Sequence, residues 1–143
     1  MINIAFPPPT FKIKNENGRE LIFDECRKQW VILTPEEWVR QNFLQYLIQV
    51  KSYPATLIAV EREIQLGDTR KRFDIAVFKN AEPWMIVECK EMKVELNEAV
   101  LKQILNYNIT LRVMYLVITN GTSTFALHLD KGKFEWLQSI PDF

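Results

Sequence analysis

The sequence predicts an α/β fold of the α+β type, with a mixed β-sheet core flanked by helices. Three strand-like segments follow one another between residues 56 and 90 with short polar turns between them, a pattern typical of an antiparallel meander. A helical pattern precedes the meander, and a second one joins it to a β-branched run. Because a helix that connects two strands of one sheet makes them parallel, we expect parallel and antiparallel neighbours in the same sheet.

Length and composition fit one compact domain spanning residues 1–143. Hydrophobic residues make up 48% of the chain and charged residues 25%, which is a globular balance. The 18 basic and 18 acidic residues cancel, and this argues against a protein that coats DNA. No apolar run approaches the roughly 18 residues of a membrane span, and the N-terminus does not resemble a signal peptide. We therefore expect a cytoplasmic protein without membrane contact, whose two cysteines are reduced.

An extended arm is expected over residues 1–10, because three consecutive prolines neither continue a helix nor donate to a β-ladder. Two strands are expected next, at about 11–14 and 20–24, and a third at 29–33. The first helix should then run from Pro35 to about 50.

The start of this helix has a strong signal in T-P-E-E. Thr34 has the side chain of an N-cap, proline is common at the first helical position, and Glu37 stands three residues after Thr34, where it would close a capping box. Apolar residues recur at helical spacing beyond it, and S-Y-P ends the helix because a residue before proline avoids the helical region.

The remaining elements follow in order. Polar turns are expected at 65–71 and 80–83 within the meander. The second helix is expected over 95–110, and the run at 112–119 is typical of a strand that is buried on both faces. A hairpin over 122–138 completes the chain.

Charged side chains lie at one end of two neighbouring strands. In R-F-D-I-A-V-F, strict alternation places Asp74 on one face with Ala76 and Phe78. In W-M-I-V-E-C-K, Glu88 and Lys90 are two residues apart, so both side chains share a face of the next strand. The turn between the two strands is short, so the strands pair and the three charged side chains converge at one end of the sheet.

This constellation suits metal-assisted hydrolysis of a phosphodiester. Adjacent carboxylates repel each other unless a cation lies between them, and Mg²⁺ takes carboxylate oxygens, a backbone carbonyl and waters as ligands. Asp74 and Glu88 would supply the carboxylates to Mg²⁺ or Mn²⁺ and Cys89 the carbonyl, while Lys90 would hold or activate the attacking water. The structural alternative is a salt-bridged strand end, because E-x-K also arises by chance in a charged chain.

The chain also resembles a known family. Asp74, followed after thirteen residues by Glu88-Cys89-Lys90 and flanked by two helices, resembles the PD-(D/E)xK nuclease superfamily. More narrowly, T-P-E-E-W-V-R-Q, R-F-D-I-A-V-F, I-V-E-C-K, Q-I-L-N-Y-N and Y-L-V-I-T-N-G resemble the N-terminal nuclease domain of type I restriction enzyme R (HsdR-like) subunits. The similarity covers about residues 30–130 and implies a restriction-endonuclease-like fold.

The resemblance implies the same metal ligands and the same catalytic lysine, and it adds three residues to the site. Glu37 would be a supporting acid on the first helix, and Gln103 and Tyr107 would match a Q-x-x-x-Y element. Two alternatives stay open. Glu37 is equally explained as a capping-box residue, and Tyr107 also fits the core stripe of the second helix.

A basic cluster, Arg70, Lys71 and Arg72, stands just before the first strand carboxylate. It is either a solvated turn or a contact to the DNA backbone.

Two hypotheses follow. The first is a Mg²⁺-dependent endodeoxyribonuclease that lacks the helicase motor of full R subunits, so that a helicase or restriction-complex subunit, or a homodimer, would supply the affinity for DNA that a neutral chain lacks. The second is a catalytically idle module of the same fold, which binds DNA or a protein of a restriction or repair complex.

Overall fold

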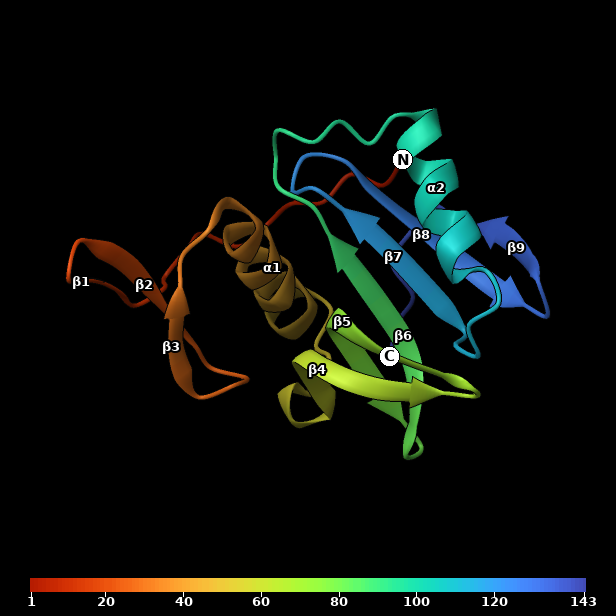
Figure 1. Ribbon diagram of the computed structural model, residues 1–143, viewed down its shortest axis with the longest axis horizontal. Helices are drawn as coiled ribbons and strands as arrows, with labels where there is room; N and C mark the ends of the chain where they lie inside the picture. The colour runs from red at the N-terminus through yellow and green to blue at the C-terminus, as the bar shows by residue number, and fades with distance from the viewer.

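Two β-sheets and two α-helices make up the computed structural model, which describes residues 1–143 (Figure 1). The smaller sheet contains β1 (Ile13–Glu16), β2 (Arg19–Asp24) and β3 (Gln29–Ile32). The larger sheet contains, in spatial order, β4 (Ile58–Leu66), β5 (Thr69–Lys79), β6 (Glu82–Cys89), β7 (Tyr115–Thr119), β8 (Thr124–Asp130) and β9 (Lys133–Trp136). The helices are α1 (Pro35–Gln45) and α2 (Glu98–Asn108).

The six-stranded sheet is mixed, as the sequence predicts. Strand β6 pairs with β7 in parallel, with α2 in the connection, and every other neighbouring pair is antiparallel. The α/β fold with a mixed sheet flanked by helices is therefore confirmed. Neither helix has the length and apolar character that a membrane crossing requires.

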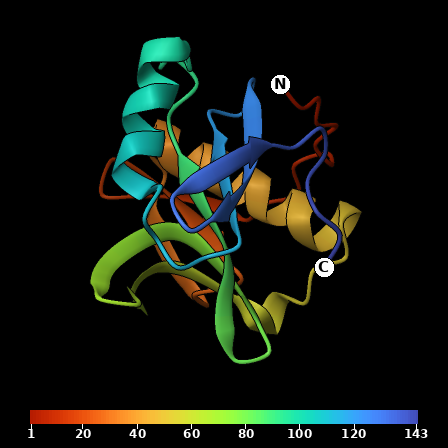
Figure 2. The ribbon, with the colours of Figure 1, turned by 90° about the vertical axis from the view of Figure 1, so that its right-hand side faces the viewer.

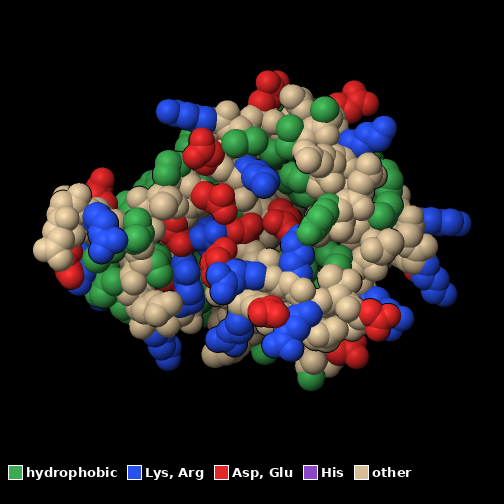
Figure 3. Space-filling view, viewed as in Figure 1, with side chains coloured by type: hydrophobic (Ala, Val, Ile, Leu, Met, Phe, Trp, Pro, Cys, Tyr) green, Lys and Arg blue, Asp and Glu red, His purple; other side chains and the backbone are tan.

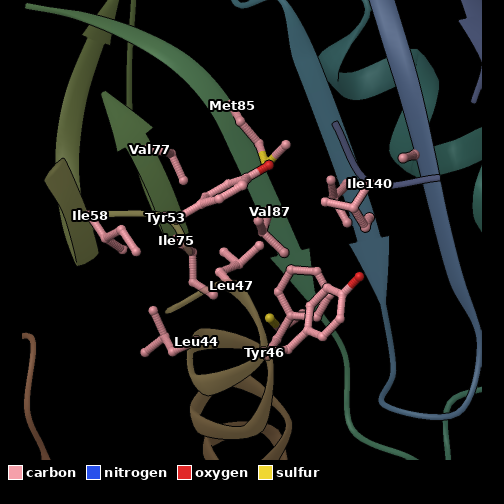
Figure 4. Close-up of a cluster of buried hydrophobic side chains, with 14 of the residues drawn as sticks. Leu44, Tyr46, Leu47, Tyr53, Ile58, Ile75, Val77, Met85, Val87 and Ile140 are labelled. Carbon is pink, nitrogen blue, oxygen red and sulfur yellow. The ribbon is translucent and has the colours of Figure 1, made fainter. Parts of the chain in front are cut away.

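The helices cover opposite faces of this sheet, as the side view shows (Figure 2). Alternate residues of each strand pack on opposite sides, so Val87 contributes to the cluster that contains α1 and Ile86 to the cluster that contains α2. Figure 4 shows the α1 cluster, in which Leu44 and Leu47 lie against Ile75 and Val87 of the central strands.

Helix α1 begins as predicted, and a π-helical turn follows it directly. The Thr34 hydroxyl accepts a hydrogen bond from the Glu37 N–H at 3.0 Å, which is the expected N-cap. From Tyr46 to Val50 the chain continues as a π-helical turn, which the sequence did not predict. Tyr46 and Leu47 are both buried there and belong to the core on the α1 side.

The N-terminal arm runs along the large sheet. The Ile2 N–H donates to the Thr124 carbonyl at 2.8 Å, and the Ile2 side chain is buried in the α1 cluster. Beyond the arm, the small sheet lies on the far side of α1 from the large sheet (Figure 1).

Four expected elements have boundaries that are wrong by a few residues. The first strand, expected at about 11–14, is β1 at Ile13–Glu16. Helix α2 begins at Glu98 because the Asn97 side chain accepts from the Val100 N–H and caps it. Strand β7 begins at Tyr115, since the preceding residues form turns. The turn between β4 and β5 is only the two residues Gly67 and Asp68, so the strands extend over most of the range expected as a turn.

Candidate active site

The β4–β5 ladder is interrupted where Glu61 and Asp74 face each other. Pairing runs from Ile58↔Val77 to Val60↔Ile75 and resumes at Arg62↔Phe73. Glu61 has φ 52°, a left-handed conformation that is rare for a residue with a side chain. The faces to which alternate side chains point are exchanged at this position in both strands. On β5, Ile75 packs on the α1 side, but Phe73, two residues earlier, packs on the α2 side. On β4, Val60 packs on the α1 side, but Ile64, four residues later, packs on the α2 side.

This exchange of faces corrects one prediction about Asp74. Ala76 and Phe78 pack in the α2 cluster, but the Asp74 carboxylate contacts Arg40 of α1, so the three side chains do not share a face. The regular β5–β6 pairing also stops at Ile75, and Asp74 Oδ2 accepts the Cys89 N–H at 2.9 Å in place of a backbone carbonyl. Asp74 therefore lies where the two strands diverge.

Arg40 is the centre of a buried ionic cluster that the sequence did not predict. Its Nη2 lies 2.6 Å from Asp74, 2.8 Å from Glu61 and 3.3 Å from Glu36, and its Nη1 lies 2.6 Å from Glu37. Burial disfavours the Arg40 charge, but the hydrogen bond to Asp74 and the nearby carboxylates outweigh burial and raise its pKa. Only the spacing of Arg40 three residues after Glu37 on one helix could have suggested the pair.

The acids around Arg40 are crowded. Burial raises the pKa of Glu36 and of Glu61, and the negative charge of Asp74 adds to this rise. Figure 3 shows acidic side chains gathered in the middle of this face, with Lys and Arg side chains around them.

Glu37 belongs to this cluster by its side chain and to the helix cap by its backbone. Its carboxylate accepts from Arg27 Nη2 at 2.8 and 2.9 Å, from Arg40 and from Gln41. The Thr34 N–H donates to the Ile32 carbonyl instead, so the capping box is only half formed. Glu37 therefore takes part in the N-cap through its N–H only, and its carboxylate lies in the buried cluster. Its role as a supporting acid of the active site stays a prediction.

A second group of polar residues lies between β5, β6 and α2. Glu88 and Lys90 both line a cavity of about 450 Å³, so the prediction that they share a face is confirmed. Lys71 Nζ lies 3.2 Å from Glu88 and 3.3 Å from the Asn108 side-chain oxygen. Burial raises the pKa of Glu88, Lys71 opposes this rise, and the charge of Asp74 adds to it.

Gln103 and Tyr107 line the same cavity from α2. Tyr107 is 72% exposed, so the alternative that it belongs to the core stripe is wrong. Its ring centroid lies 4.3 Å from Lys71 Nζ, a cation–π distance. The Q-x-x-x-Y pair therefore borders the cavity that contains the E-x-K residues.

The three basic residues expected to act together are separated by the strand. Because β5 begins at Thr69, Arg70, Lys71 and Arg72 alternate in direction and do not form a turn. Lys71 points to Glu88, whereas exposed Arg70 pairs with Glu63 at 2.6 Å. Arg72 is also exposed, and its nearest carboxylate is that of Glu61 at 3.9 Å. Their contact with DNA stays a prediction.

The donor set can be compared with the requirements of a hard cation. No three Asp, Glu, His or Cys side chains stand together in the geometry of a metal site. The donor types nevertheless fit Mg²⁺, because carboxylate oxygens are its usual protein ligands. Arg40 and Lys71 place positive charge against Asp74 and Glu88, as a metal would. The carbonyl of Cys89 as a third ligand stays a prediction.

Comparisons with known proteins place the chain in a family. No curated protein sequence matches it. A family model described as type I restriction enzyme R protein N terminus matches residues 35–141. The match begins at the first residue of α1 and includes both charged groups around Asp74 and Glu88, and it leaves out the small sheet. The mixed α+β architecture agrees with the nuclease-like domain that this family implies. The chain belongs to the family of type I restriction enzyme R protein N-terminal regions.

Proposed function

We propose that this chain is a Mg²⁺-dependent endodeoxyribonuclease domain that hydrolyses phosphodiester bonds of DNA. The observation that carries the proposal is that Asp74 accepts the N–H of Cys89, the residue between Glu88 and Lys90, and that Glu88 and Lys90 line a cavity of about 450 Å³. Membership of the restriction R-protein family supports the same reaction.

Asp74 and Glu88, with the Cys89 carbonyl, would hold the Mg²⁺ or Mn²⁺ ion. When bound, such an ion polarises the phosphate and lowers the pKa of an attacking water. Burial raises the pKa of Glu88 and the charge of Asp74 adds to the rise, so a cation near both carboxylates would favour their ionised forms.

Lys90 differs from Lys71 in a way that suits a catalytic lysine. Lys71 is held by Glu88 and Asn108, whereas the Lys90 side chain forms no ion pair. Its ammonium lines the cavity and is free to hold a water or to stabilise negative charge on the phosphate. Gln103 and Tyr107, at the rim, would orient the DNA strand.

DNA affinity would come from only a few exposed cations. The formal net charge of the chain is zero, and Arg62, Arg70 and Arg72 are the exposed arginines on β4 and β5. Because phosphate contacts dominate DNA affinity, the isolated chain should bind DNA weakly. A restriction-complex subunit with a helicase motor, or a second copy of this chain, would strengthen the binding.

The test is nicking of supercoiled plasmid by the wild type, Lys90→Ala and Lys93→Ala. Lys93 is a matched control, because it ends the second E-x-K of the chain and is exposed in the turn after β6. We expect nicking only with Mg²⁺ or Mn²⁺, a rate reduced by about 100-fold or more in Lys90→Ala, and no change in Lys93→Ala. Nicking in EDTA, or equal rates for the two variants, would contradict the proposal.

One observation favours a second candidate, the catalytically idle module. Asp74 and Glu88 already have side-chain cations against them, and no ready three-residue metal group exists. For this candidate we expect DNA binding without nicking, and no heat of binding when Mg²⁺ is titrated into the protein.

A further inference from the structure

Arg40 is the cation shared by three carboxylates, which come from three different elements. Its Nη2 contacts Glu36 of α1, Glu61 of β4 and Asp74 of β5 within 3.3 Å. The three carboxylates therefore share one positive charge, and Asp74 is among them. The geometry therefore makes the guanidinium a direct competitor for the carboxylate that the proposed metal requires.

The guanidinium is not fully satisfied in this position. Arg40 is only 6% exposed, yet its Nε has no hydrogen-bond partner. A buried donor without a partner is costly, so the contacts of Nη1 and Nη2 are made at the expense of Nε.

Glu61 is a partner of Arg40 that does not depend on Asp74. Its φ of 52° is sterically unfavourable for a residue with a side chain, and it lies in the middle of a strand. The evident result of this conformation is to bring the Glu61 carboxylate beside Asp74, where it accepts from Arg40 at 2.8 Å. Strained residues that persist in a fold are typical of functional sites.

We propose that Arg40 is an internal counter-ion that a divalent metal must displace from Asp74, and that Glu61 retains the displaced guanidinium. This inference rests on the proposed function, since it takes Asp74 as a metal ligand. A divalent ion on Asp74 would repel a guanidinium only 2.6 Å from the same carboxylate, so the two cations exchange. Arg40 keeps Glu36, Glu37 and Glu61 when it leaves Asp74, and it therefore acts as a positioning residue that sets the metal affinity.

The experiment measures metal affinity without catalysis. Ca²⁺ and Mg²⁺ are titrated into the protein by calorimetry, and the shift of the unfolding temperature with Ca²⁺ is measured in parallel. Arg40→Gln removes the competing cation and should tighten binding by about tenfold or more. Glu61→Gln removes the negative charge that would retain the displaced guanidinium and should weaken binding by a similar factor.

Matched controls separate competition from a general change of charge. Arg72→Gln removes a positive charge that lies 3.9 Å from the Glu61 carboxylate. Glu63→Gln removes a negative charge two residues after Glu61 on the same strand. Both side chains are exposed, so each control should change the affinity by less than about threefold. Affinities of Arg40→Gln and Arg72→Gln within twofold of each other would overturn the inference.

Arg40→Gln leaves four carboxylates without their shared cation, and it can fail to fold without metal. Recovery of its folded circular dichroism signal by Ca²⁺ then supports the inference. If Ca²⁺ does not restore the fold, Glu61→Gln decides: weaker binding than Glu63→Gln supports displacement, and equal binding overturns it. If the wild type and every folded variant bind no metal at millimolar concentration, the proposed function fails together with this inference. If the wild type binds metal and nicks DNA but Arg40→Gln does not differ from its control, only this inference fails.

Discussion

Lys71→Met tests whether the Lys71 ammonium lowers the pKa of Glu88, which burial raises. Lys71 Nζ lies 3.2 Å from Glu88, and methionine keeps much of the apolar stem while it removes the ammonium. The ammonium also lies 4.3 Å from the Tyr107 ring centroid and 5.2 Å from that of Phe73. The substitution therefore removes one ion pair, the hydrogen bond to Asn108 and two cation–π contacts.

The expected cost follows from the exposure of the pair. The side chains of Lys71 and Glu88 are 25% and 15% exposed, which is intermediate between a surface and a buried pair. Exposed pairs contribute less than about 1 kcal/mol, and removal of one partner from a buried pair costs about 3–5 kcal/mol. We expect about 2 kcal/mol for the ion pair and about 0.5–1 kcal/mol for the ring contacts. At about 3 °C per kcal/mol for a chain of this length, the unfolding temperature at pH 7 should fall by about 8 °C.

The cost of losing the ion pair depends on pH, whereas the cost of losing the ring contacts does not. Burial raises the folded-state pKa of Glu88 above its ordinary value of 4.5, so the ionised carboxylate destabilises the fold at pH values above that pKa. Loss of Lys71 raises the pKa further, because Lys71 lowers it in the wild type. Below pH 4.5 the carboxyl is protonated in both the folded and the unfolded state, and the penalty disappears. At pH 4 only the ring contacts and the hydrogen bond to Asn108 should be lost.

The assay is thermal unfolding followed by circular dichroism at pH 7 and pH 4. It is carried out on the wild type, Lys71→Met, Glu88→Gln and the double variant. In the Glu88→Gln background, Lys71→Met should cost only the ring contacts and the hydrogen bond to Asn108 at both pH values. Equal losses at pH 4 and pH 7, or the same loss with and without the Glu88 carboxylate, would refute the reasoning and assign the effect to packing.

Three further predictions concern single features. Thr34→Ala removes the acceptor of the Glu37 N–H and should cost about 1 kcal/mol, or about 3 °C in the unfolding temperature, whereas no shift would mean that the buried Glu37 carboxylate alone fixes the start of α1. Tyr107→Ala should change stability by less than about 0.5 kcal/mol because the side chain is 72% exposed, while plasmid nicking should fall; a large loss of stability would contradict its assignment to the rim. Burial raises the pKa of Cys26 to about 11 and also raises that of Cys89, so neither thiol should react quickly with iodoacetamide at pH 8 until urea is added; rapid labelling of the folded protein would contradict this environment.

The elements that the sequence predicts well are those with local causes. The N-cap at Thr34, the short turn between β5 and β6, and the alternation that places Glu88 and Lys90 on one face depend on neighbouring residues only. The parallel β6–β7 pair follows from the helix between them. Local rules also explain the modest boundary errors, because a capping side chain such as that of Asn97 moves a helix start by a few residues.

The arrangement of charges was decided by tertiary structure. Alternation along β5 predicts the wrong face for Asp74, because the faces of both strands are exchanged at the left-handed Glu61 on the neighbouring strand. The residues around Asp74 do not predict the left-handed conformation of Glu61, because Glu61 lies thirteen residues earlier in the chain.

The sequence by itself therefore determined the mixed sheet, the family and the pair of Glu88 and Lys90 at the end of a strand. Only the tertiary structure decided which cations neutralise the carboxylates: Arg40 from α1 at Asp74 and Lys71 from β5 at Glu88. The physical reason is that secondary structure depends on hydrogen bonds and periodicity within short segments. Ion pairs at this site depend instead on how the fold arranges a helix and three strands that are distant in the sequence. Only that arrangement brings their charged side-chain atoms within about 3 Å of one another.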